Sequence, residues 1–285
     1  DLEFKGDAIS TTSELVKISS DGNLGLEEGQ KFERGGIYRF TVDVTKGNTK
    51  AVLTVEKIGK VDLPAPDIFF GNDKMEVTDT DIYKSEQVFT QGQMITVTGI
   101  DNLNEWWIDP DFFEKQSDGA LKFLPINGDY RVTANAVLKY FSVMALKDGK
   151  PAKLQDDGTG AIWAIGKGIG KPSVTSSEVG WEPGKALCLA QVAPKKYQLT
   201  LKAGETLKTS GDSEVISFKF FHQNDWGGEF GNYANSILVE QLKLTDSGNL
   251  EMQDNKAFEE GAVYRFTIDV TNGNANADLK VEKIN

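Results

Sequence analysis

The 285-residue sequence has one cysteine and one histidine, and it contains no basic run and no long apolar run. Because Cys188 is the only cysteine, an intrachain disulfide and a zinc site built from cysteines are both excluded. No apolar stretch approaches the roughly 18–20 residues that a membrane-spanning helix needs. A chain of this length can bury hydrophobic cores of its own, so its stability does not require covalent crosslinks.

The charge balance limits the classes of ligand that the chain is expected to bind. The sequence has 31 basic and 43 acidic residues, a net charge of −12, and the charges are spread along the chain. Phosphate backbones are bound mainly through clustered Lys and Arg, so this composition argues against nucleic acid and against an anionic membrane surface. Neutral ligands and cations remain as candidates.

An internal repeat links a segment near the start of the chain to a segment at its end. Residues 22–58 align without a gap to residues 248–284, and 21 of the 37 aligned positions are identical. A fainter third copy begins at Gly128-Asp129-Tyr130-Arg131, which matches the Tyr-Arg motif of the other two copies. The chain therefore carries three versions of one module end.

The repeated segments have the pattern of β-hairpins. Apolar and polar residues alternate over residues 264–270, Asn272-Gly273-Asn274 provides a turn, and the alternation returns over residues 279–284. Short strands with Gly, Asn, Asp and Pro between them recur elsewhere, without a long helical period. We therefore predict an all-β fold of tandem immunoglobulin-like β-sandwich modules.

The repeat also predicts the domain boundaries. We expect an incomplete module over residues 1–60, a middle immunoglobulin-like module over 61–150 and a C-terminal β-sandwich module over 151–285. In the last copy, roughly 70 further residues precede the point that matches the start of the chain. We therefore interpret the first module as the C-terminal part of a repeat, truncated at its amino end, which would leave an open sheet edge.

No strong catalytic motif is present. Counting residues leaves a Ser–His–Asp arrangement around His222 open, but no Gly-x-Ser-x-Gly motif supports it. The glycine-rich run Gly166–Lys171 lacks the spacing of a phosphate-binding loop. Asp109-Pro110-Asp111 is typical of a turn or cap, and Asp156-Asp157-Gly158 is an incomplete calcium-loop pattern that leaves calcium binding open. We predict that the chain is not an enzyme and needs no cofactor or metal.

The tryptophans are the more informative residues. An indole ring packs well on the C–H face of a sugar, but it also serves as a core anchor in β-sandwiches. Trp163 lies in an apolar run and is expected in the core. The neighbours Trp106 and Trp107 are expected to point in opposite directions, one buried and one exposed. Trp181 and Trp226 lie in loop-like segments next to glycines, where exposure is plausible.

The C-terminal module, with its aromatic spacing, resembles the starch-binding modules of SusE/SusF-like outer-membrane lipoproteins of Bacteroidota. The resemblance covers most of residues 61–285. It rests on Ile162-Trp163-Ala164-Ile165-Gly166, Gly180-Trp181-Glu182-Pro183, Tyr197-Gln198-Leu199-Thr200, Phe218-Lys219-Phe220 and Asp225-Trp226-Gly227-Gly228.

The resemblance implies a non-catalytic protein that binds an oligosaccharide or polysaccharide at the cell surface. It implies anchoring in the outer membrane, facing outward, through an N-terminal lipidated segment that this chain does not contain. Components of a SusC/SusD-like transporter are the implied protein partners. The insertion at residues 167–190 and the lack of a matched tryptophan in the middle module leave starch specificity open.

The candidate glycan-binding residues follow from the resemblance and from sequence proximity. Trp181 and Trp226 fall where the aromatic residues of the family's motif fall. The further candidates are Lys171, His222, Gln223, Asp225, Trp106 and Trp107. The alternative hypothesis is a structural or adhesive array of immunoglobulin-like modules without a sugar site. Exposed tryptophans favour the first hypothesis, and buried tryptophans favour the second.

Overall fold

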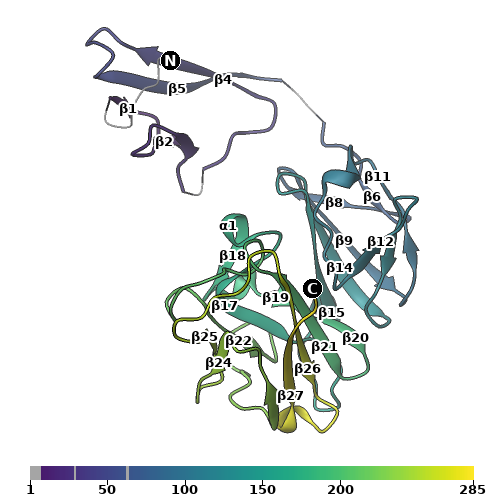
Figure 1. Ribbon diagram of the computed structural model, residues 1–285. Helices are drawn as coiled ribbons and strands as arrows, with labels where there is room; N and C mark the ends of the chain where they lie inside the picture. The colour runs from purple at the N-terminus through teal and green to yellow at the C-terminus, as the bar shows by residue number, and fades with distance from the viewer. Residues whose placement is uncertain (1–7, 29, 62–63) are drawn as a thin grey trace. The chain divides into compact units, whose positions relative to one another are not determined.

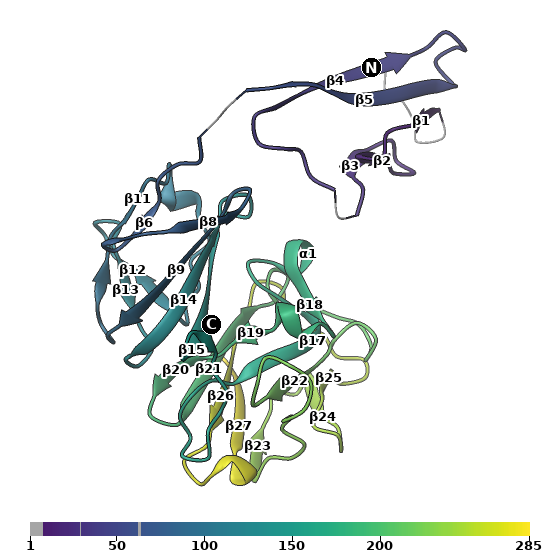
Figure 2. The same ribbon diagram turned by 180° about the vertical axis from the view of Figure 1, so that it is seen from behind.

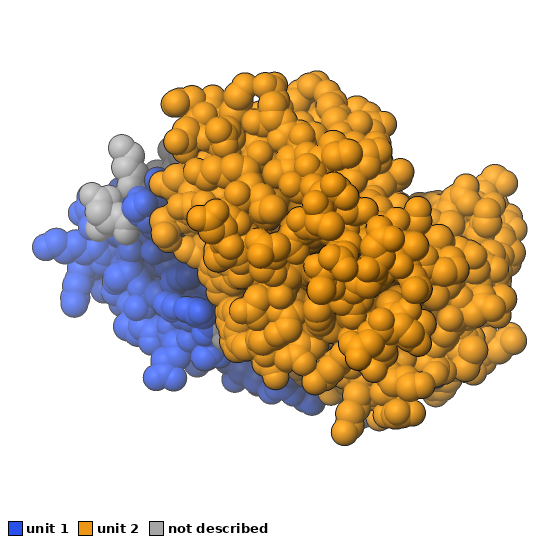
Figure 3. All heavy atoms as spheres, turned by 90° about the horizontal axis from the view of Figure 1, so that it is seen from below, with its two compact units in different colours: residues 1–65 blue, residues 66–285 orange. Residues whose placement is uncertain are grey.

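The computed structural model describes residues 8–28, 30–61 and 64–285, whose regular secondary structure is almost entirely β-strand (Figure 1). The predicted all-β fold of tandem β-sandwich modules is confirmed. The chain divides into two compact units, unit 1 (Asp1–Ala65) and unit 2 (Pro66–Asn285), which are coloured separately in Figure 3.

Unit 1 contains two small groups of strands. Strands β4 and β5 form a long antiparallel hairpin, β1 lies parallel to β5, and β2 pairs with β3. Their bounds are β1 (Ile9–Thr11), β2 (Val16–Ile18), β3 (Leu24–Leu26), β4 (Gly36–Asp43) and β5 (Ala51–Lys60).

The first half of unit 2, here called the middle module, extends from β6 to β16. Its main sheet has the order β16-β15-β14-β9-β8, and two three-stranded sheets, β10-β13-β12 and β11-β6-β7, complete it. The elements are β6 (Phe69–Phe70), β7 (Asp73–Lys74), β8 (Glu76–Asp79), β9 (Ile82–Phe89), β10 (Met94–Ile95), β11 (Val97–Thr98), η1 (Leu103–Glu105), β12 (Phe113–Lys115), β13 (Leu121–Phe123), β14 (Gly128–Asn135), β15 (Tyr140–Lys147) and β16 (Lys150–Pro151). Phenylalanines from several strands fill its core, with Phe70 against both Phe89 and Phe141.

The second half of unit 2, here called the C-terminal module, extends from β17 to β27 (Figure 2). One sheet has the order β18-β17-β22-β25-β24, with β19 also paired to β17, and the other has the order β20-β21-β26-β27-β23. The elements are β17 (Trp163–Gly170), α1 (Val174–Ser177), β18 (Glu178–Gly180), η2 (Pro183–Lys185), β19 (Leu187–Cys188), β20 (Ala190–Ala193), β21 (Lys196–Lys202), β22 (Ser217–Phe221), β23 (Asn235–Ile237), β24 (Leu242–Leu244), β25 (Leu250–Met252), β26 (Val263–Asp269), η3 (Asn274–Asn276) and β27 (Asp278–Lys283).

The two sheets of the C-terminal module pack face to face. Phe218 of β22 and Phe266 of β26 meet edge to face with ring centroids 5.5 Å apart, and both are fully buried. Trp163 is also fully buried, as predicted, and its Nε1–H donates to the carbonyl of Ala152 at 3.0 Å. The buried indole thus satisfies its single donor while it fills the core.

The glycine-rich run Gly166–Lys171 belongs mainly to strand β17 rather than to a loop. Gly166 has a φ of +141°, and a Cβ atom there would lie 2.3 Å from the Cα of Phe218. The glycine is therefore explained by close strand packing. The following insertion at residues 167–190 contributes the end of β17, α1, β18, η2 and β19.

The five strands that the structure describes in unit 1 correspond in sequence position to the last five strands of the C-terminal module. Adding 226 to the bounds of β1, β2 and β3 gives the bounds of β23, β24 and β25 without any shift, and β4 and β5 fall on β26 and β27 within three residues at either end. The parallel pairing of β1 with β5 likewise matches that of β23 with β27. Unit 1 therefore has the strands of the second half of a C-terminal-type module.

Candidate functional site

Trp226 is presented by a tight loop after strand β22. Gly227 and Gly228 have φ angles of +83° and +68°, a conformation that glycine adopts without steric cost. The Asp225 carboxylate accepts a hydrogen bond from the Trp226 backbone N–H at 2.8 Å, and Gln223 Nε2 donates to the Trp226 carbonyl at 2.7 Å. Asp225 and Gln223 therefore shape the loop that carries the indole.

Trp181 is presented by the insertion between β17 and β19. It follows Gly180, whose φ is +58°, and it precedes the short 3₁₀ helix η2. Its side chain is half-buried and packs against the hydrophobic core. This placement holds the ring firmly while part of it stays open to solvent.

The indole rings of Trp181 and Trp226 are in contact. The ring centroids of Trp181 and Trp226 are 6.4 Å apart with an interplanar angle of 26°, an offset stacked arrangement. Trp226 also contacts Phe221, with centroids 6.0 Å apart and planes at 74°. Phe221 is buried, whereas Trp226 is 52% exposed. The stacked Trp181 and Trp226, here called the tryptophan pair, thus form an aromatic surface that rests on a buried ring.

The chemistry of this surface suits an uncharged ligand with a flat apolar face. Two charged side chains of the Trp181 loop, Glu182 and Lys185, neutralise each other in an exposed ion pair of 3.0 Å. Two aromatic rings fixed by backbone and core contacts cost little conformational entropy when a ligand packs on them.

His222 faces away from the tryptophan pair. Successive side chains of an extended segment point to opposite sides, and while Phe221 contacts Trp226, His222 contacts Phe230 with centroids 4.3 Å apart. His222 lines a cavity of about 560 Å³, together with Asp156 and Glu229. Its proximity to Trp226 in sequence therefore does not bring it to the same surface.

The environment of His222 is that of a half-buried, neutral imidazole. Burial lowers the pKa of His222, although the charges of Asp156 and Glu229 act in the opposite direction. Its Nε2 atom is buried and has no hydrogen-bond partner among the residues that the structure describes. The side chain is therefore uncharged at neutral pH.

Lys171 is not a surface residue, which corrects its place among the glycan-binding candidates. Its side chain is 2% exposed, and Nζ donates to Asp109 Oδ1 and Oδ2 at 2.9 and 2.7 Å and to Asp111 Oδ2 at 3.1 Å. An ammonium in a buried pair with two carboxylates is not available to a sugar. Its partners belong to another module and lie far away in the sequence, so no local pattern reveals the pair.

The pair Trp106 and Trp107 is also removed from the candidate surface. Trp106 is buried and stacks on Phe141 with centroids 4.6 Å apart. Trp107 is half-buried, and its Nε1–H donates to Glu205 Oε1 at 2.6 Å. The two rings point in different directions, but the less buried one is engaged by the neighbouring module rather than free.

The segment Asp109-Pro110-Asp111 forms the predicted turn and also connects the two modules. The Asp109 side chain accepts a hydrogen bond from the Asp111 backbone N–H at 3.1 Å. Asp111 in turn accepts from the backbone N–H of Thr200 at 2.6 Å, from its hydroxyl at 2.6 Å and from Gln198 Nε2 at 2.7 Å. The turn is thereby fixed to strand β21 of the C-terminal module.

The carboxylates of Asp109 and Asp111 both pair with the Lys171 ammonium, and their pKa values are shifted in opposite directions. Burial raises the pKa of Asp109, and the neighbouring charge of Asp111 adds to the effect although Lys171 opposes it. Burial also disfavours the charge of Asp111, but Lys171, Thr200 and Gln198 outweigh it and lower the pKa of Asp111. Asp111 is therefore the better stabilised of the two anions.

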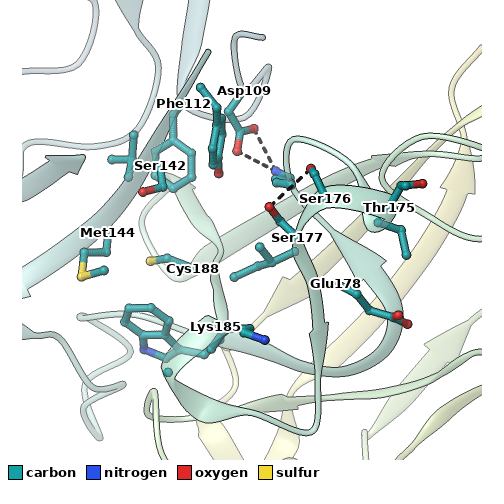
Figure 4. Close-up of a pocket in the computed structure, with 18 residues that line it drawn as sticks. Asp109, Phe112, Ser142, Met144, Thr175, Ser176, Ser177, Glu178, Lys185 and Cys188 are labelled. Atoms are coloured by element: carbon teal, nitrogen blue, oxygen red, sulfur yellow. Dashed lines mark hydrogen bonds and ion pairs between the residues drawn. The ribbon is translucent and has the colours of Figure 1, made fainter. Parts of the chain in front are cut away.

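A cavity of about 540 Å³ lies between the two modules beside this ion pair (Figure 4). The middle module contributes Asp109, Phe112, Tyr140, Ser142, Val143 and Met144, and the C-terminal module contributes Trp163 together with residues of β17, α1 and the 184–188 loop. Burial raises the pKa of the Cys188 thiol in its wall to about 12. A thiol with this pKa stays protonated at neutral pH and is a poor nucleophile.

Two negative findings bound the chemistry of the described ranges 8–28, 30–61 and 64–285. Within them, His, Cys, Asp and Glu side chains form no group of three that could hold a metal ion. The same residues include no helix with the length and apolarity needed to cross a bilayer.

Two protein-family models match parts of the chain. The chain belongs to the family described as Domain of unknown function (DUF5121), whose model matches residues 1–45 and 157–271, more than half of the sequence. The model of a second family, Domain of unknown function (DUF5125), matches residues 62–154. The two DUF5121 ranges end at residues 45 and 271, which are equivalent positions of the internal repeat. None of the curated proteins matches the chain.

Proposed function

We propose that the chain is a non-catalytic glycan-binding protein that holds a neutral oligosaccharide or polysaccharide on the tryptophan pair. The observation that supports the proposal is the stacking of Trp181 on Trp226, two loop tryptophans that are far apart in sequence. The weakly polar C–H face of a pyranose packs on such rings without any need for charge. A neutral glycan is also compatible with the net charge of −12.

The expected affinity is modest. A single aromatic platform contributes only a few kcal/mol after the cost of immobilising the ligand is subtracted. A dissociation constant in the micromolar to millimolar range, about −8 to −4 kcal/mol, is therefore expected for an oligosaccharide. Several copies of the tryptophan pair on one polysaccharide chain would raise the avidity through effective concentration.

The setting of this activity is proposed from the resemblance to SusE/SusF-like proteins. In that setting the protein is a lipid-anchored component of the outer surface of the outer membrane. It captures polysaccharide there and acts beside SusC/SusD-like transporter components. The other modules of the chain would then serve as spacers that hold the tryptophan pair away from the anchor.

Affinity electrophoresis tests the proposal. Native gels that contain one member of a panel of neutral polysaccharides, such as amylopectin, xylan, galactomannan or a mixed-linkage glucan, are compared with a gel without polysaccharide. The wild-type chain should be retarded by at least one of them. Trp226→Ala should lower the affinity at least tenfold, or about 1.4 kcal/mol, whereas Trp226→Phe should retain part of it.

Val137→Ala is the matched control, because Val137 is a highly exposed apolar residue of the middle module. It should leave retardation unchanged. The melting temperature of Trp226→Ala should stay close to that of the wild type, since half of this ring is already in water. Retardation of Trp226→Ala equal to that of the wild type would place the sugar elsewhere. Absence of retardation across the panel would favour the alternative, an array of structural or adhesive modules.

A further inference from the structure

Unit 1 exposes apolar side chains that are buried at the matching positions of the C-terminal module. Phe40 is 48% exposed and its counterpart Phe266 is fully buried, and Leu24 is 47% exposed while Leu250 is fully buried. Four more pairs behave in the same way. The pairs are Leu26 with Met252, Phe32 with Phe258, Val42 with Ile268 and Val44 with Val270. We call the six exposed residues of unit 1 the open face.

The structure shows what covers these positions in the C-terminal module. Phe218 and Phe220 of strand β22 pack on Phe266 with centroids 5.5 and 6.4 Å apart. Strand β22 also pairs with β25, where Phe218 lies opposite Leu250. Strand β21 pairs with the whole length of β26, from Lys196 opposite Asp269 to Lys202 opposite Val263. The cover is thus made by the first half of the module, residues 157–226.

The backbone of unit 1 is open at the same two places. Among the described residues, β4 pairs only with β5, and β3 pairs only with β2. Within that part of the chain, the edges of β4 and β3 that correspond to the β21-facing edge of β26 and the β22-facing edge of β25 have no strand beside them. An unpaired edge next to an apolar face is a template for strand addition.

We infer that the open face binds a half-module with the strand pattern of residues 157–226. Its β21-like strand would pair antiparallel with β4, and its β22-like strand would pair with β3. The repeat argues for this occupant, because residues 157–226 cover the matching positions of the C-terminal module and lie directly before the segment that is equivalent to unit 1. An adjoining half-module also avoids the several kcal/mol of translational and rotational entropy that a separate partner would lose.

The experiment adds this half-module to the full chain. A copy of residues 157–226 is placed directly before Asp1, and amide hydrogen exchange is measured for β4 in the extended and the original chain. Exchange over Tyr38–Val42 should slow at least about a hundredfold in the extended chain, because the amides become part of a packed sheet. Exchange in unit 2 should stay unchanged, which provides an internal control for folding.

Two variants test whether the protection of β4 depends on the apolar contact between the added copy and the open face. Phe218→Asp with Phe220→Asp, made only in the added copy, should abolish the protection of β4 because the cover loses its apolar side. Phe40→Asp in the extended chain should abolish it from the other side of the same interface. Neither readout involves a sugar, so failure here would leave the proposal for the tryptophan pair untouched.

Three outcomes would overturn the inference. One is unchanged exchange of β4 in the extended chain. Another is equal protection by the added copy that carries the two aspartates. The third is a concentration-dependent dimer of the original chain that protects β4, since the open face would then belong to a second copy.

Discussion

Lys171 Nζ lies 2.7 and 2.9 Å from the two carboxylate oxygens of Asp109, and this contact joins the C-terminal module to the middle module. Both side chains are at most 3% exposed. Removal of the ammonium would leave two buried carboxylates without a counter-ion. Lys171→Ala is therefore expected to lower the free energy of unfolding of unit 2 by about 3–5 kcal/mol, measured by urea denaturation.

Lys167, which lies in strand β17 four residues before Lys171, provides the control for this prediction. Lys167 forms an ion pair of 2.9 Å with Glu214, whose side chain is 81% exposed. Lys167→Ala should change the free energy of unfolding by less than about 1 kcal/mol. Similar losses for the two variants would mean that the buried pair contributes no more than an exposed one.

The two aspartates of the turn should respond to pH in opposite ways. The pKa of Asp111 is lowered, so its contribution to stability is present above its unfolded pKa of about 3.9 and is lost as the pH falls through its folded pKa. The pKa of Asp109 is raised, so its contribution is present below the unfolded pKa and is lost as the pH rises through the folded pKa. The stability lost in Asp111→Asn should therefore grow from pH 3 to pH 7, whereas the loss in Asp109→Asn should shrink.

Urea denaturation of both variants and the wild type at intervals across this pH range measures these trends. Asp111→Asn should be the more destabilised variant at pH 7, because Asp111 accepts the hydrogen bonds of Thr200 and Gln198 as well as that of Lys171. Parallel pH profiles for the two variants would contradict the unequal division of charge between the carboxylates.

The thiol of Cys188 should be almost inert in the folded protein. Burial raises its pKa from 9.0 to about 12, so the thiolate fraction falls by about a thousandfold. Alkylation by iodoacetamide at pH 8 should be slower by at least this factor in the folded chain than in urea. Val137→Cys in the Cys188→Ser background supplies an exposed reference thiol, and equal rates for Cys188 and this reference would show that the inter-module cavity is open to reagents.

The sequence predicts individual strands better than it predicts the contacts between modules. The alternation over residues 264–270 corresponds to strand β26, and the apolar run around Trp163 gives a buried strand, because both patterns depend on local period and burial. The ion pair of Lys171 could not be predicted in this way. It depends on how two modules pack, which no local pattern records.

For the candidate site too, local patterns in the sequence were informative and tertiary contacts were not predictable. The motif resemblance singled out Trp181 and Trp226, but only the tertiary structure brings the two rings within 6.4 Å. Proximity in sequence was misleading for His222, because neighbouring residues of an extended segment face opposite sides. The need for glycine at position 166 also comes from the tertiary structure. The close approach of Phe218 leaves no room for a side chain there, and this contact joins two strands that are distant in sequence.

The matched phenylalanines Phe40 and Phe266 allow a test of how far packing, rather than sequence, sets stability. They occupy equivalent positions of the repeat, yet one is 48% exposed and the other is fully buried. Phe266→Ala removes a ring from between two sheets and should cost about 3–5 kcal/mol. Phe40→Ala removes a ring that is already about half exposed, and it should change stability by less than about 1 kcal/mol.

Amide hydrogen exchange separates the two effects, because β4 reports on unit 1 and β26 reports on unit 2. Phe266→Ala should speed the exchange of β26 by more than a hundredfold, since each loss of about 1.4 kcal/mol corresponds to a factor of ten. Phe40→Ala should alter the exchange of β4 by less than about tenfold. A large effect of Phe40→Ala would mean that the ring is covered in solution, and the open face of unit 1 would then be closed without any added half-module.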